Sequence, residues 1–283
     1  MDDIRSYVEQ HRAEHARELA AWIAVPSISA TGEGMDRAPN YALNLLRDSG
    51  LAVQLVETGG GPLIVGHAEG SGPHVVIYGH YDVQPPGPLS EWDSLPFELT
   101  ERGGRFYGRG TGDNKGQHLA QLLGLRALRD CRGALPCAVT VLLDGEEELG
   151  SPNLESTLRG MDLDGDLVIW SDGPVHESGE PTVCLGVRGI VTFEITVRGA
   201  DLPLHSGNWG GVAPNPAWEL VWLLSTLRSA EGRIGLDWNA PELTDAERSA
   251  LAALPVDVPA TLNSVGLDRM DVPLYKDFSE RLA

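Results

Sequence analysis

The chain has 283 residues, and its 21 lysines and arginines stand against 41 aspartates and glutamates, for a formal charge of −20. At about 150 residues per domain, this length predicts two domains. The acidity disfavours nucleic acid and anionic membranes as partners, because both attract clustered cationic side chains. The sequence has no apolar run of about 18 residues that could cross a membrane. An acidic N-terminus unlike a signal peptide, and three cysteines without a CxxC pair, predict a cytoplasmic location.

The first part of the chain alternates between predicted helices and predicted strands. Apolar periodicity predicts helices over Asp2–Ala24, Tyr41–Ser49 and Gly116–Arg129. The predicted strands are Ala52–Val56, Leu63–Val65, Val75–Tyr78, Ala138–Leu143 and Leu167–Trp170. Most of these runs are apolar without alternation, which is typical of strands buried on both faces of a largely parallel sheet. The sequence therefore predicts an α/β fold in which helices flank a twisted, largely parallel sheet.

The pattern changes after about Cys184. Residues Ile190–Val197 alternate between apolar and polar side chains, which predicts a strand with one solvated face. An amphipathic helix is predicted over Asn215–Arg228, and only weak helical stretches follow Gly232. We therefore expect a second, smaller α+β domain that begins near Gly186.

Metal-ligand residue types follow three of the predicted buried strands. His80 and Asp82 come after the first, the run Asp144–Glu148 after the second, and Asp172 after the third. Ligand sites in open α/β sheets form beyond the carboxyl ends of the strands, so these loops are expected to converge. Asp113 lies in a glycine-rich stretch before the leucine-rich helix. One imidazole with several carboxylates and no thiolate suits zinc, manganese or cobalt.

At this point the sequence resembles a known family. The segments GHYDVQPPG, WDSLPFEL, GRGTGDNKG, DGEEELGS, WSDG and LHSGNWGG occur in the order seen in family twenty of the clan MH metallopeptidases. That family includes carnosinases, aminoacylases, acetylornithine deacetylase and succinyl-diaminopimelate desuccinylase, and the wording of the motifs is most similar to the dipeptidase branch. The resemblance implies a zinc-exopeptidase-like catalytic domain with a lid. It also implies hydrolysis of a dipeptide or N-acyl amino acid by a metal-bound hydroxide.

The resemblance also implies a ligand set for two zinc ions, with manganese or cobalt as alternatives. By matching positions, His80, Asp113 and Asp172 would hold one ion, and Asp113 would bridge to a second ion held by Glu148. The peptide bond between Asp113 and Asn114 corresponds to one that is cis in relatives.

The remaining roles come from the same matching. Glu147 would act as general base, and Asp82 would orient His80. His205 corresponds to the residue that, in dimeric relatives, reaches the partner subunit's active site and stabilises the oxyanion. The resemblance thus implies a homodimer formed through the lid domain.

The sequence departs from the family pattern at one place. The family takes its last metal ligand from a histidine that follows the lid, whereas no histidine follows His205 here. We therefore expect residues 1–185 to form the N-terminal part of the catalytic domain and residues 186–283 to form part of the lid, with the C-terminal catalytic segment absent. The alternative to a hydrolase is an inactive or single-metal module that dimerises or binds a partner. A zinc exopeptidase of another family in the clan is a further alternative.

Several of these polar residues also allow a plainer interpretation. Asp113 is also suited to cap the helix that follows it, and His205 to be an exposed lid residue. Glu147 and Glu148 have the alternative of a solvated charge run, and for Glu146 that is the interpretation we prefer. The histidines outside the motifs, His118 among them, are expected on the surface or on helices.

Overall fold

The computed structural model describes residues 2–173, 183, 190–229, 244–254 and 257–268. The chain divides into two compact units, residues 1–174 and 175–283. The first unit contains a five-stranded sheet and its helices, and it carries nearly all of the residues implicated by the sequence. No helix in the described ranges is both long and apolar enough to span a lipid bilayer.

The sheet of the first unit has the strand order β1-β2-β6-β3-β7. Its strands are β1 (Ala52–Val56), β2 (Leu63–Ala68), β3 (His74–His80), β6 (Ala138–Asp144) and β7 (Leu167–Trp170). β6, β3 and β7 pair in parallel, whereas β2 is antiparallel to both β1 and β6, so β2 alone among the five runs in the opposite direction. The expected α/β fold with a largely parallel sheet is thus found. The carboxyl ends of β3, β6 and β7 meet at one edge.

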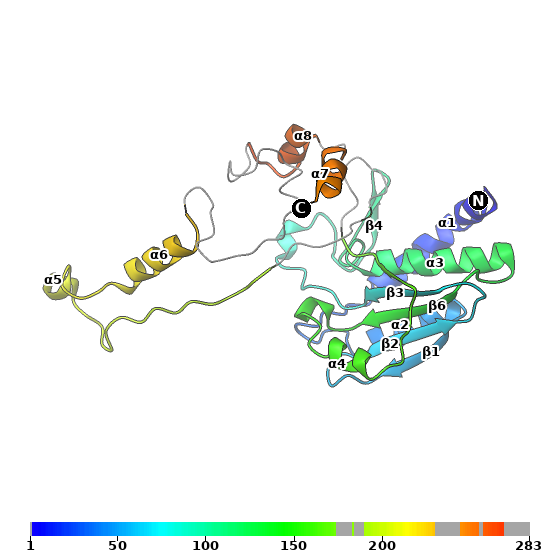
Figure 1. Cartoon of the computed structure of the whole chain (residues 1–283), viewed down its shortest axis with the longest axis horizontal. Helices are drawn as coiled ribbons and strands as arrows, with labels where there is room; N and C mark the ends of the chain where they lie inside the picture. The colour runs from blue at the N-terminus through cyan, green and yellow to red at the C-terminus, as the bar shows by residue number, and fades with distance from the viewer. Residues whose placement is uncertain (1, 174–182, 184–189, 230–243, 255–256, 269–283) are drawn as a thin grey trace. The chain divides into compact units, whose positions relative to one another are not determined.

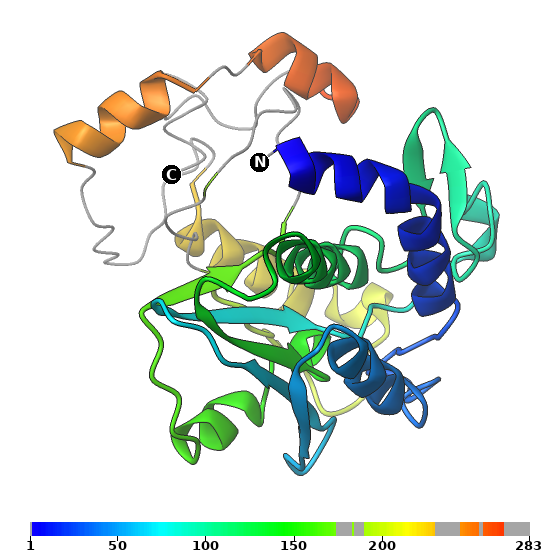
Figure 2. The same ribbon diagram turned by 90° about the vertical axis from the view of Figure 1, so that its right-hand side faces the viewer.

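Helices lie over one face of this sheet. α2 (Ala38–Asp48) and α3 (Lys115–Arg132) pack against its strands, and α1 (Asp2–Ile23) lies along α3 (Figure 1). Their shared core includes Leu46, Leu122 and Val141, all fully buried. α3 ends at Gly133, whose positive φ of 79° lets the chain leave the helix in the left-handed conformation. Figure 2 shows α3 nearly end-on above the strands.

The opposite face of the sheet has a smaller core. Leu63, Val76, Tyr78 and Leu142 pack there against side chains of α4 (Leu154–Arg159) and the loop after it. Neighbouring positions of β6 therefore contribute to different cores, as the period of two in a strand requires. A small hairpin, β4 (Thr100–Arg102) with β5 (Arg105–Tyr107), and the short helix η1 (Leu89–Glu91) lie between β3 and α3 in the sequence.

One expectation about burial is wrong. β7 is one of the two edge strands of this sheet, and all four of its residues are exposed, Trp170 at 62%. An apolar run shows that a strand is suited to burial on both faces, but its place in the sheet decides whether anything covers it. The described chain pairs β7 on one side only, with β3.

The described residues of the second unit include several short helices. These are α5 (Ser206–Trp209), α6 (Pro216–Leu227), α7 (Asp245–Ala252) and α8 (Val258–Ser264). The predicted helix over Asn215–Arg228 is confirmed by α6, whose start is capped by the Asn215 side chain accepting from the amide of Ala217. A capping box between Thr244 and Glu247 starts α7.

The strand predicted over Ile190–Val197 is not found. Within the described part of the second unit, these residues belong to no strand, and Ile190 and Phe193 are exposed. Alternating side chains make a segment suitable for a half-buried strand, but a strand also needs a neighbour that completes its backbone hydrogen bonds. The alternation is a property of the segment itself, whereas the pairing partner must come from another part of the chain.

Candidate metal centre

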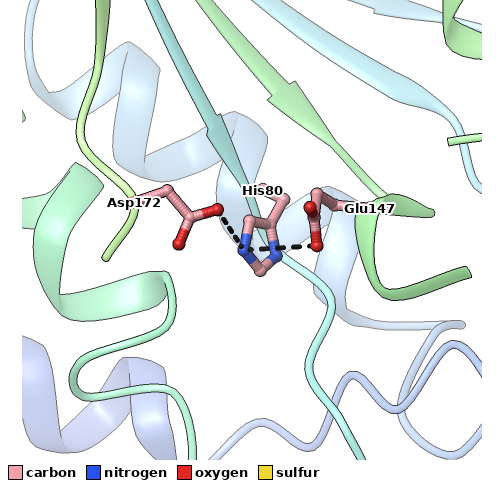
Figure 3. Close-up of side chains that lie close together, drawn as sticks. All are labelled: His80, Glu147 and Asp172. Atoms are coloured by element: carbon pink, nitrogen blue, oxygen red, sulfur yellow. Dashed lines mark ion pairs between the residues drawn. The ribbon is translucent and has the colours of Figure 1, made fainter. Parts of the chain in front are cut away.

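The strand ends bring the expected residues together at one edge of the sheet. His80 is the last residue of β3, Glu147 lies on the short helix η2 (Glu147–Leu149) after β6, and Asp172 follows β7. Asp113 precedes α3 across a cis peptide bond to Asn114, which confirms the cis bond that the resemblance implied. In Figure 3, Asp172 and Glu147 lie on opposite sides of the His80 ring.

His80 is the centre of this arrangement, and its side chain is fully buried. Its Nδ1 lies 3.0 Å from the backbone oxygen of Asp82 and 3.4 Å from that residue's Oδ1. Its Nε2 faces carboxylate oxygens of Asp113 at 2.9 Å, Asp172 at 3.7 Å and Glu147 at 3.9 Å. None of these contacts has hydrogen-bond geometry, so Nε2 is a buried ring nitrogen without a hydrogen-bond partner among the described residues.

Asp82 was expected to orient His80, and it also holds the turn that carries the glutamates. Its buried carboxylate accepts from the backbone amide of Glu147 at 3.2 Å and from that of Glu148 at 3.1 Å. These two donors belong to the first turn of η2 and have no partner within it. One side chain thus connects the end of β3 with the loop after β6.

The three consecutive glutamates have different surroundings. Glu146 is buried and its Oε2 accepts from Asn153 at 2.8 Å, so the expectation of a solvated charge is wrong for this residue. The carboxylate of Glu148 accepts from the side chain of Gln84 at 2.8 Å and from its backbone amide at 3.1 Å. Glu147 has a partly exposed side chain directed toward His80.

Two groups of side chains have ligand atoms close enough to hold a cation. One contains His80, Glu147 and Asp172, and the other contains His80, Asp113 and Glu148; within each, the ligand atoms lie within 4.8 Å of one another. The resemblance implied a different grouping, in which His80, Asp113 and Asp172 hold one ion and Glu147 stays free. The structure brings all five residues to one place and shares His80 between both groups.

The electrostatics of the centre follow from burial and crowding of like charges. Burial lowers the pKa of His80, but the carboxylates of Asp82, Glu147 and Asp113 outweigh it and raise this pKa to about 9. Burial raises the pKa of Glu147, with Asp172 and Glu148 adding to the increase and His80 opposing it. An assembly of carboxylates around one imidazole is stabilised by positive charge placed among them.

The residues present fit a divalent cation. The orphaned Nε2 of His80 is a ligand atom directed at carboxylates, and a buried polar atom without a partner is costly unless something satisfies it. The donor set contains nitrogen and oxygen without sulfur, which suits zinc, manganese or cobalt. The position of His80 is also stabilised through its other nitrogen, as is usual for metal-binding histidines.

His205 belongs to the second unit and stands directly before α5. Its side chain is exposed, and its Nδ1 accepts from the backbone amide of Gly207 at 3.0 Å. Its role toward a partner subunit therefore stays a prediction.

The sequence profile of the peptidase family M20/M25/M40 matches residues 76–269, which is more than half of the chain. The chain belongs to this family. The match begins on β3, just before His80, and includes every residue placed at the candidate centre. It also includes His205 and α6 of the second unit.

Curated relatives include two groups of dipeptidases. The Beta-Ala-His dipeptidase of Rattus norvegicus is 29% identical over 95% of this chain and 60% of its own length. The Cys-Gly metallodipeptidase of Schizosaccharomyces pombe is 33% identical over 72% of this chain and 44% of its own length. The chain thus spans at most about three fifths of the length of these relatives.

Solved structures agree in fold. An M20 family metallo-carboxypeptidase from Sulfolobus solfataricus superimposes with a TM-score of 0.81 and 31% identity, covering 95% of this chain and 62% of that one. Human carnosine dipeptidase 1 gives a TM-score of 0.75 and 26% identity over 99% of this chain and 63% of its own. The family that the motifs suggested is therefore confirmed.

The sequence did not indicate the burial of several residues behind the centre. Asn114 and Lys115 are fully buried, and His118, expected on the surface or on a helix, is on α3 and 1% exposed. Burial lowers the pKa of Lys115 to about 7, and its ammonium lies 4.3 Å from the centre of the Trp22 ring. The position of Asn114 next to Asp113 is the feature of the sequence that could have indicated its role. A buried polar side chain beside a candidate ligand needs hydrogen-bond partners of its own.

The buried His118 predicts a measurable dependence of stability on pH. Burial lowers its pKa to about 3, with the charges of His80 and Lys115 adding to the shift. In the unfolded chain this histidine becomes protonated below about pH 6.5, whereas in the folded chain it stays neutral down to about pH 3. The free energy of unfolding therefore falls as the pH drops from about 6.5 toward 3. Between pH 7 and 5 this one group costs about 2 kcal/mol.

Urea unfolding of the unmodified chain and of His118→Asn at both pH values measures this cost. The acid-induced loss of unfolding free energy is expected to be about 2 kcal/mol smaller in the variant, since asparagine does not titrate. Equal losses in the two proteins would contradict the buried, neutral histidine.

Proposed function

We propose that this chain carries the hydrolytic centre of a dinuclear metallopeptidase that cleaves the amide bond of a dipeptide or N-acyl amino acid. The observation that carries the proposal is the buried Nε2 of His80, which faces the carboxylates of Glu147 and Asp172 after neighbouring strands and that of Asp113 before α3. Membership of the peptidase family supports it. The names of the relatives, Beta-Ala-His dipeptidase and Cys-Gly metallodipeptidase, favour a dipeptide as substrate.

His80, Asp113 and Asp172 would hold one ion and Glu148 a second, with Asp113 bridging the two. Zinc is the ion we expect, and manganese or cobalt would suit the same donors. Bound ions of this kind supply Lewis acidity toward the scissile carbonyl and toward water. Asp113 suits the bridging position because its carboxylate is exposed and lies nearest to His80 Nε2.

Glu147 is the general base of the proposal. Its partly exposed carboxylate accepts the proton of the attacking water and passes it to the leaving amine. Burial raises the pKa of Glu147. A general base transfers protons most effectively when its pKa lies near the pH at which the enzyme works, and the shift is in that direction. Asp82 holds both His80 and the turn of Glu147, so base and imidazole keep a fixed separation.

The two parts of the chain would have different tasks. Residues 1–185 would form the catalytic part, and residues 186–283 would belong to a lid through which two copies of the chain dimerise. The exposed His205 would reach the partner subunit's active site and stabilise the oxyanion there.

Metal analysis together with a peptidase assay tests the proposal. The chain is loaded with zinc, freed of excess ion and analysed by plasma mass spectrometry, and is then assayed on β-alanyl-histidine, cysteinylglycine and an N-acetyl amino acid. Two bound ions and turnover of a dipeptide are expected. One ion or none, without turnover of any of these amides, would favour the binding module instead.

A further inference from the structure

A row of three hydrogen-bonded, buried side chains, Trp22, His118 and Asn114, leads from α1 to the candidate metal centre. The indole Nε1 of Trp22 donates to Nε2 of His118 at 3.0 Å. Nδ1 of His118 lies 3.3 Å from Oδ1 of Asn114. All three side chains are buried, so water does not compete for these hydrogen bonds.

The direction of each hydrogen bond between these three side chains is fixed. An indole N–H only donates, so Nε2 of His118 must accept. Burial keeps the ring neutral by lowering the pKa of His118, so its proton lies on Nδ1 and is donated to Asn114 Oδ1. The amide oxygen of Asn114 is thereby assigned to the side of His118, and its nitrogen to the other side.

Trp22, the first of these three side chains, contacts both Tyr41 and Lys115. Its ring stacks on Tyr41 with the centroids 4.8 Å apart and the planes 2° from parallel. The ammonium of Lys115 lies over it, and Lys115 also donates to the backbone oxygen of Val25. The indole N–H therefore has a defined direction toward His118.

Asn114 connects the loops that carry the candidate ligands. Its Oδ1 accepts from the backbone amide of His80 at 3.2 Å. Its Nδ2 donates to the backbone oxygen of Ser171, next to Asp172, at 2.7 Å and to Gln117 Oε1 at 2.7 Å. Asn114 itself follows Asp113 in the sequence, so one amide is joined to the backbone beside three candidate ligands.

The close approach of this amide to β3 depends on Gly79. A Cβ at that position would lie 2.8 Å from Asn114 Oδ1 and 3.0 Å from the Cβ of His118. If the amide were turned over, Nδ2 would face the N–H groups of His80 and His118, and Oδ1 would face the oxygens of Ser171 and Gln117. The hydrogen bonds of Asn114 to the backbone of His80 and of Ser171 would both be lost, so the orientation of this amide matters for the two loops.

We propose that Asn114 is a positioning residue whose amide, oriented by Trp22 through His118, sets the spacing of His80, Asp113 and Asp172 for metal binding. The inference rests on the proposed function in that these three residues are its metal ligands. Partners behind the ligands of metal sites typically contribute about 10–100-fold to metal affinity. An effect of this size is expected here through the backbone of the ligands.

The test compares variants of His118 in the full chain. His118→Leu removes the donor to Asn114, and His118→Asn keeps an amide donor near the position of Nδ1. Ser49→Ala is the control, because Ser49 is also buried and hydrogen-bonded to α3, through Arg126, but has no contact with the ligand loops. For each protein we measure the zinc dissociation constant by competition with a chromophoric chelator, the visible spectrum of the cobalt form, and the thermal unfolding of the metal-free chain.

His118→Leu is expected to raise the zinc dissociation constant about 10–100-fold and to change the cobalt spectrum. His118→Asn is expected to restore most of the affinity, and Ser49→Ala to lower the unfolding temperature without changing the affinity. A dissociation constant and spectrum of His118→Leu equal to those of the unmodified chain would overturn the inference. So would an affinity in Ser49→Ala that falls as far as in His118→Leu, since general destabilisation would then explain both.

Two further measurements keep the outcome decisive. If His118→Leu does not fold, Trp22→Phe replaces it, since this change keeps an aromatic ring and removes only the N–H donor; unchanged zinc affinity there overturns the inference. If the unmodified chain binds zinc no more tightly than Asp172→Ala does, the proposed function itself fails. Tight binding by the unmodified chain and by His118→Leu alike rejects only the role of Asn114.

Discussion

Replacing Glu147 by glutamine is expected to lower the rate of dipeptide hydrolysis by about 10²–10⁴-fold, the usual contribution of a general base. Glutamine keeps the size and polarity of the side chain but cannot accept the proton of the attacking water. The turn that carries Glu147 is expected to stay in place, because Asp82 holds it through backbone amides. Steady-state turnover and metal content of the same preparations measure the two effects separately.

The metal content of this variant decides between two roles. Glu147 lies in one of the two groups able to hold a cation, together with His80 and Asp172. A variant that loses turnover and keeps its metal has lost a base. A variant that loses both has lost a ligand, and the assignment of Glu147 as base would then be wrong. Glu155→Gln serves as the control, because Glu155 is exposed and pairs with Arg159 on α4.

Replacing Asp172 by alanine is expected to raise the zinc dissociation constant more than about 100-fold for one of two sites, because direct ligands contribute more than the residues behind them. The carboxylate of Asp172 is largely buried and directed at His80 Nε2. The group of His80, Asp113 and Glu148 does not contain Asp172, so one ion is expected to stay bound.

Plasma mass spectrometry after gel filtration reads the stoichiometry, and chelator competition reads the affinity. Asp36→Ala is the matched control, since Asp36 is exposed and pairs only with Arg37 among the ion pairs of the described chain. Two ions bound to Asp172→Ala with unchanged affinity would remove Asp172 from the ligand set.

The sequence predicted that the candidate ligand residues lie close together because two local rules combine there. Apolar runs located the strands β3, β6 and β7 within a few residues, and a parallel sheet brings the carboxyl ends of its strands to one edge. His80 and Asp172 could therefore be placed near each other although they are 92 positions apart in the sequence. The motifs then narrowed the chemistry to a known family.

Other features depend on contacts that no local pattern contains. The run over Ile190–Val197 has the alternation of a strand, but pairing needs a second segment, and in the described chain it has none. β7 has the composition of a buried strand and lies at the edge of its sheet. Both errors arise because composition describes what a segment is suited to and not what surrounds it.

The buried polar residues show the same limit at the centre itself. His118 follows Asn114 by four positions, which places both on the inner side of the start of α3. Nothing in this spacing indicates that the indole N–H of Trp22 donates a hydrogen bond to His118. Glu146 is indistinguishable from its neighbours in the sequence, and only the side chain of Asn153 and the nearby backbone of Gly60 explain its burial. Partners distant in sequence decide these roles.

The run Glu146–Glu147–Glu148 has a consequence for insertions and deletions. The three side chains are identical, but Asn153, His80 and Gln84 each face a different one. Deleting one glutamate leaves two carboxylates of the same chemistry, yet it rotates the remaining turn relative to the carboxylate of Asp82. The contacts of this segment therefore depend more on the number of residues in it than on the type of any one residue. A conservative substitution at one position changes one contact, whereas the deletion of one glutamate changes the partners of the two that remain.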